Sequence, residues 1–147
     1  MPNWVYNKLT VAGANHVLDF FKKQAAEQVR PHQDSDFSFM NFVRPLHTEM
    51  AWYNDTGWYE WNINNWGCKW DAGRVEILEN SPRRITYYFE TAWAPPELAL
   101  KAMAEQYPEL EFFLHYEEEQ GWGGELVAKN SNVKQTKQWD IPGRVMK

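Results

Sequence analysis

The amino-acid sequence predicts a single α+β domain, an antiparallel sheet with two main helices on one face. Four segments show the two-residue period of half-buried strands, and two longer segments show the helical period. The order is strand, helix, strand, strand, helix, strand, which is the ferredoxin-like, split β-α-β arrangement. A length of 147 residues suits one such domain.

The first half of the chain supplies one strand, one helix and an insertion. Residues 4–11 alternate as a strand, and residues 15–29 form an amphipathic helix that Pro31 closes. The insertion, at about residues 32–73, begins irregularly, and we expect its aromatic side chains, Phe37, Phe39 and Phe42 among them, to pin it to the core. Trp58, Asn62 and Trp66 stand at helical spacing, so a short helix is predicted over 55–66, capped by Gly67.

The second half supplies a hairpin, a helix and further strands. Residues 74–79 and 84–91 are predicted strands around a turn at 79–82. A helix begins at Pro95 and Pro96 and stops at Pro108, and a strand follows over 110–117. Residues 125–130 form an extra edge strand before a weakly structured end. We therefore expect a ferredoxin-like domain over 1–126 and a basic tail over 127–147.

Composition excludes several classes of protein. A chain that is 44% hydrophobic and 16% aromatic is not intrinsically disordered, and it has no apolar run of roughly 18 residues that would span a membrane. The start lacks a secretory signal, so a cytoplasmic location is expected. The single cysteine, Cys68, excludes an internal disulfide and a cysteine-only metal site, and we expect its thiol to be at least half-buried.

Charge is distributed unevenly along the chain. Residues 100–126 carry seven carboxylates and one lysine, whereas residues 127–147 carry five cations and one aspartate. The tail either folds back over the acidic segment or stays solvated. The net charge of -5 argues against nucleic-acid binding, which normally needs a basic stripe.

Four motifs occur in a characteristic order: MPNW at 1–4, NWGCKWD at 65–71, FETAWAPP at 89–96 and YPELEF at 107–112. Together they resemble the YubB-type ferredoxin-like family of phages, plasmids and bacterial genomes, over residues 1 to about 126. Cys68 stands where threonine is more usual. The resemblance implies the fold and a mobile-element setting, and it implies no activity.

The tryptophan-rich segment is the first candidate site. Indole faces could sandwich a planar or sugar-like ligand, oriented by amide and ammonium groups. The candidate residues are Trp66, Lys69, Trp70, Trp93, Asn62 and Asn65. The alternative is that these tryptophans complete a small core, with Lys69 in a cation-π contact or an ion pair with Asp71.

The helix-free face of the sheet is the second candidate site. Strand parity places on it Trp4, Tyr6, Tyr88, Phe113 and His115. Exposed aromatic side chains on a sheet favour self-association or a protein partner. RNA binding is disfavoured because residues 83–89 lack the glycine and aromatic spacing of an RNP1 motif.

No arrangement of catalytic residues can be recognised in the sequence. His115 and Glu117 share a strand face but lack a third metal ligand, so no metal or other cofactor is expected. Pro2 would resemble the terminal proline of tautomerases only if Met1 were removed. We therefore expect a non-enzymatic binding module for a macromolecular partner. The alternative is a protein that binds or sequesters a nucleotide-like or sugar-like ligand at its tryptophans.

Overall fold

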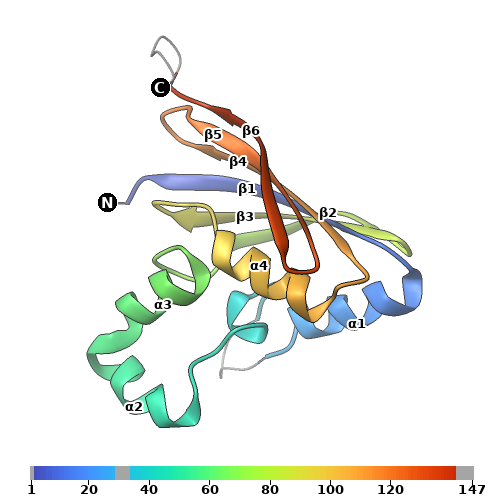
Figure 1. Ribbon diagram of the computed structural model, residues 1–147. Coiled ribbons are helices and arrows are strands. Elements are labelled where there is room, and N and C mark those ends of the chain that lie inside the picture. Colours follow the sequence, from blue (N-terminus) through green and yellow to red (C-terminus); the bar gives the residue numbers. More distant parts are fainter. Residues whose placement is uncertain (1, 29–33, 142–147) are drawn as a thin grey trace.

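The computed structural model describes residues 2–28 and 34–141 (Figure 1). Its strands are β1 (Trp4–Ala12), β2 (Gly73–Ser81), β3 (Arg84–Ala92), β4 (Glu111–Glu118), β5 (Gly123–Lys129) and β6 (Asn132–Trp139). Its α-helices are α1 (Asn15–Ala25), α2 (Met50–Trp52), α3 (Trp58–Trp66) and α4 (Glu97–Gln106). Two 3₁₀ turns, Phe39–Asn41 and His47–Glu49, precede α2, and a π-helical segment, Tyr53–Gly57, joins α2 to α3.

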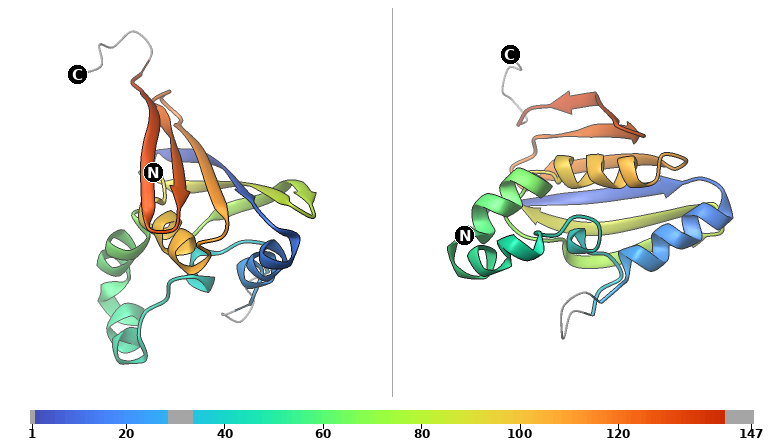
Figure 2. Two further views of the ribbon diagram at one scale, coloured as in Figure 1. Left: turned by 45° about the vertical axis from the view of Figure 1, so that its right-hand side comes forward. Right: turned by 60° about the horizontal axis from the view of Figure 1, so that its bottom comes forward.

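The strands form one antiparallel sheet in the order β2-β3-β1-β4-β5-β6. The first four strands with α1 and α4 make the predicted ferredoxin-like fold, which is confirmed. The helices lie on one side of the sheet (Figures 1 and 2). Within the described ranges no helix is long and apolar enough to cross a membrane.

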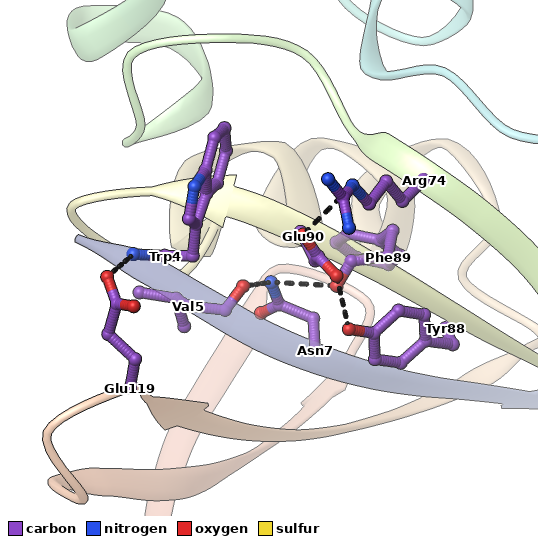
Figure 3. Close-up of polar contacts among 8 residues, drawn as sticks. All are labelled: Trp4, Val5, Asn7, Arg74, Tyr88, Phe89, Glu90 and Glu119. Carbon is purple, nitrogen blue, oxygen red and sulfur yellow. Dashed lines mark hydrogen bonds and ion pairs between the residues drawn. The ribbon is translucent and has the colours of Figure 1, made fainter. Parts of the chain in front are cut away.

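The central strand β1 shows why the sheet has two different faces. Val5, Leu9 and Val11 are at most 1% exposed on the helix side, whereas Tyr6, Lys8 and Thr10 face the other way. Asn7 shares the buried face, and its amide donates hydrogen bonds to the carbonyls of Val5 and Phe89 (Figure 3). It also donates to Thr91 Oγ1. This alternation confirms the predicted parity of the strand.

The ends of two predicted segments differ from the structure. Helix α1 ends at Ala25, before residue 29, because the next three residues are exposed and offer no apolar face to bury. The expected stop at Pro31 lies outside the described residues. Strand β6 was not predicted, and the boundary expected after Leu126 lies inside β5.

The basic segment that begins at residue 127 folds back on the acidic segment 100–126, since Lys129 pairs with Glu111 and Lys137 with Glu125.

The insertion is anchored by its aromatic residues, as predicted. Phe37, Phe39 and Phe42 are buried, and the Phe37 ring centroid lies 4.8 Å from that of Tyr87 in β3. The predicted helix over 55–66 is present, but the helical segment begins earlier, at Met50. Gly67 ends α3 with a φ of 88°, a left-handed conformation that suits glycine at a helix end.

Candidate functional site

The first candidate site is the side of the sheet opposite the helices, which we call the open face. Partners in a β-ladder point to the same side, so the registers place the predicted aromatic residues together with a polar row. Tyr6 is 39% exposed and Phe113 40% exposed, so both rings face solvent. The row that crosses the strands from β2 to β6 consists of Glu76, Tyr88, Lys8, His115, Glu125 and Lys137.

One end of the open face is rigidified by side-chain contacts (Figure 3). The Tyr88 hydroxyl donates a 2.6 Å hydrogen bond to Glu90, and Arg74 Nε lies 3.7 Å from the same carboxylate. Desolvation, together with the Glu90 carboxylate, raises the pKa of Tyr88. Trp4 anchors the start of β1, because its backbone N–H donates to the Glu119 carboxylate at 2.8 Å.

A hollow of about 510 Å³ lies on the open face beside β4 and β5. His115 Nδ1 is 3.0 Å from Glu125 Oε2, and Lys137 Nζ is 3.7 Å from Glu125 Oε1. The Trp139 ring lies 5.4 Å from the His115 ring. The hydrogen bond from His115 lowers the pKa of Glu125, and the charge of Lys137 acts in the same direction. The hollow is lined by Lys8, Thr10, Phe113, Leu114, His115, Glu125, Leu126, Val127 and Thr136.

We expect the substitution His115→Ala to raise the pKa of Glu125 toward its ordinary value of 4.5, because the main hydrogen bond to the carboxylate is lost. A carboxyl whose pKa is lowered by folding stabilises the fold above its unfolded-state pKa. That contribution is lost as pH falls through the folded-state value. NMR titration of the Glu125 side-chain carbon measures the shift. His16→Ala, an exposed change on α1, is the control, and an unchanged Glu125 pKa in His115→Ala contradicts the assignment.

The second candidate site is a concavity of about 520 Å³ in the insertion, which we call the insertion pocket. Residues from the irregular segment, from the helical stretch and from the link to β2 converge on it. Its volume falls within the range of small-molecule pockets, and its walls are predominantly aromatic and thioether groups. The lining residues are Met40, Arg44, Pro45, Met50, Tyr53, Asn54, Trp58, Asn62, Trp66, Trp70 and Asp71.

Asp71 holds the irregular segment beside the pocket. Its carboxylate accepts hydrogen bonds from Ser38 Oγ and from the backbone N–H groups of Phe39, Met40 and Ala72, at 2.6 to 3.2 Å. Burial raises the pKa of Asp71, and these four donors oppose the rise. The carboxylate therefore organises the 3₁₀ turn at Phe39, and the ion pair considered for Lys69 and Asp71 is absent from the described salt bridges.

Three of the six residues proposed for this site line the pocket: Asn62, Trp66 and Trp70. Trp66 is only 1% exposed, and its indole N–H donates to the Val43 carbonyl, so it belongs mainly to the core. Asn62 accepts from the Tyr53 hydroxyl and donates to the Lys69 carbonyl.

The other three residues lie outside the pocket lining. Lys69 stacks on Trp70, with Nζ 4.6 Å from the ring centroid, which is the cation-π contact considered above. Asn65 donates to the Trp61 carbonyl one turn earlier in α3. Trp93 is 51% exposed with a φ of 76°, because the chain turns away from β3 there.

The sequence did not predict Arg44, Met50 and Asn54 as lining residues. Arg44 lies in the irregular segment, which has no period that would place its side chain. A π-helical segment carries Asn54, and such a segment shifts side chains off the ordinary helical spacing. One feature of the sequence points to Arg44: it is an isolated arginine in a segment rich in aromatic residues.

Other candidate groups do not form a site. Cys68 is buried as expected, and burial raises the pKa of its thiol, which makes it a poor nucleophile. Across residues 2–28 and 34–141, no cluster of three His, Cys, Asp or Glu side chains could hold a metal ion.

Three comparisons with known proteins bear on this fold. No curated protein matches the chain. A solved structure, the protein api92 from Yersinia pseudotuberculosis, is similar with a TM-score of 0.65 at 8% identity, covering 99% of this chain and 100% of that one. At this identity the likeness shows the fold alone. A family model described as the ferredoxin-like domain in Api92-like protein matches residues 65–144, more than half of the sequence, so the chain belongs to that family.

Proposed function

We propose that the chain is a non-enzymatic binding module of a phage or plasmid element that holds a protein partner on the open face in the cytoplasm. The observation that carries the proposal is the exposure of Tyr6 and Phe113 on β1 and β4, the two strands whose opposite side is buried in the core. Solvent-facing aromatic rings on a rigid surface are typical of protein interfaces. The resemblance to YubB-type proteins supports the mobile-element setting.

Charge on the open face favours a protein over a nucleic acid. Charges of both signs accompany the aromatic rings there: Glu90 and Glu117 lie opposite Tyr6, whereas Lys8 and Lys137 lie in the row of His115 and Glu125. These carboxylates would repel phosphate groups, whereas a protein partner can present cations to them. The partner we propose is therefore a protein whose surface combines apolar groups with charges of both signs.

A matched capture experiment tests the proposed function. Immobilised wild-type chain should retain a partner from its host lysate, and the double variant Tyr6→Thr/Phe113→Thr should lose it, because threonine keeps strand propensity but removes both rings. The control, Phe20→Ala/Leu98→Ala, removes exposed apolar groups from α1 and α4 and should retain the partner. Capture that the open-face variant leaves unchanged, or that the control abolishes, contradicts the proposal. If the captured protein is the chain itself, the open face is a self-association surface.

The insertion pocket supports a second candidate function, the binding of a small ligand. The specific observation is a concavity of about 520 Å³ with Trp58 and Trp70 on its walls. A pocket of this size and lining accommodates one planar molecule.

A further inference from the structure

The chemistry of the insertion pocket narrows the ligand that it would accept. Four aromatic side chains line it, and they differ in accessibility. Tyr53 and Trp66 are nearly buried and form its base, whereas Trp58 is partly exposed and Trp70 is 37% exposed. The Trp58 ring, and the part of the Trp70 ring that Lys69 and Trp4 leave uncovered, are therefore the surfaces against which a flat ligand could stack.

Most polar groups of the pocket already have partners inside the protein. The Asn62 amide uses both ends, one with Tyr53 and one with the Lys69 carbonyl. The Trp66 indole N–H and all four donors around Asp71 are likewise engaged. A ligand thus cannot use these groups without breaking the packing of the insertion.

The exposed side chains of Arg44 and Asn54 are the exceptions, and of these two only Arg44 is charged. Its guanidinium carries five N–H donors, and the one hydrogen bond described for it is a long contact of 3.4 Å to the Asn41 carbonyl. The side chain is exposed and takes part in no salt bridge among the described residues. Arg44 can therefore offer a bidentate pair of donors to an anion at the pocket.

A second cation, Lys69, lies next to the pocket, against the Trp70 ring that forms part of its wall. Lys69 Nζ lies 4.6 Å from the centroid of Trp70 and 5.7 Å from that of Tyr59. The nearest opposing charge on the lining is Asp71, whose oxygens are shielded by four hydrogen bonds. The accessible groups of this region thus include two aromatic rings, the Asn54 amide and two cations, Arg44 and Lys69.

We propose that the insertion pocket binds a planar aromatic molecule bearing an anionic group, with the ring against Trp58 and Trp70 and the anion on Arg44. The proposal rests on the second candidate function and names its ligand class. It disfavours an uncharged sugar, which has no negative charge to pair with the guanidinium of Arg44. It uses neither of the exposed open-face rings Tyr6 and Phe113, although Trp70 lies 6.0 Å from Trp4, centroid to centroid.

Two matched fluorescent probes test this assignment. The anionic probe is 1-anilinonaphthalene-8-sulfonate, and the neutral probe is N-phenyl-1-naphthylamine, which has the same aromatic framework. We expect saturable 1:1 binding of the anionic probe to the wild-type chain. Arg44→Gln should lower the affinity for the anionic probe by about tenfold and change the affinity for the neutral probe by less than about twofold. Trp58→Leu should lower the affinity for both probes, because both stack their rings on Trp58.

Controls separate this result from other sources of probe binding. Arg84→Gln removes an exposed arginine from the sheet and should change neither affinity. The open-face variant Tyr6→Thr/Phe113→Thr should also leave both affinities unchanged, although it abolishes protein capture if the proposed function holds. The assignment is overturned if the anionic probe does not saturate, if Arg44→Gln leaves its affinity unchanged, or if only the open-face variant weakens it.

Discussion

Replacing Asp71 by alanine is expected to lower the free energy of unfolding by about 4 kcal/mol, because four buried or half-buried donors lose their acceptor at once. Three of them are backbone N–H groups at Phe39, Met40 and Ala72, which no side-chain rearrangement can move away. Urea unfolding followed by far-ultraviolet circular dichroism measures the change.

The matched control for this loss is Asp55→Ala. Asp55 is an exposed carboxylate in the π-helical segment of the same insertion, and its removal should change stability by no more than about 0.5 kcal/mol. Equal stabilities of the two variants would show that the Asp71 carboxylate does not organise the irregular segment. If Asp71→Ala alone strongly lowers the free energy of unfolding, Asp71 maintains the structure of the pocket, whether or not it also contacts a ligand.

The fold was predictable because its central strands are one-sided. Helices cover only one face of β1 and β4, so Val5, Leu9 and Phe112 alternate with exposed residues and reveal the strand period. Strand β6 lacked this signal. Its residues are mostly polar and exposed on both faces, since it pairs only with β5 at the edge of the sheet. Asn130, whose φ is 58°, lies in the turn that leads into β6. An asparagine is a typical turn residue, but it does not by itself indicate that a strand follows.

The insertion pocket was only partly predictable. Helical spacing correctly placed Asn62 and Trp66 on one side of α3, but it could not tell a buried indole from an exposed one. That difference depends on what packs against each ring, and for Trp66 the contact is the Val43 carbonyl, 23 residues earlier. Arg44 is brought to the same pocket by the anchoring of residues 37–42, a long-range effect that has no sequence period.

Replacing Phe37 by alanine tests that anchoring and should cost about 4 kcal/mol of stability, since a fully buried aromatic ring leaves a cavity when truncated. The Phe37 ring lies 4.8 Å from Tyr87, 5.1 Å from Phe89 and 5.6 Å from Phe39, centroid to centroid. It therefore joins the start of the insertion to β3. Phe20→Ala, on a ring that is 68% exposed, is the control and should cost well under 1 kcal/mol.

Hydrogen exchange decides whether Phe37 acts locally or on the whole core. If Phe37 anchors the insertion, then Phe37→Ala should reduce amide protection between Met40 and Trp58 by more than it does in β1 and β4, because local opening then needs less energy than global unfolding. A uniform loss of protection would instead make Phe37 an ordinary core residue. In the first case the geometry that brings Arg44 to Trp58 depends on Phe37, and Phe37→Ala should weaken probe binding even where the sheet remains folded.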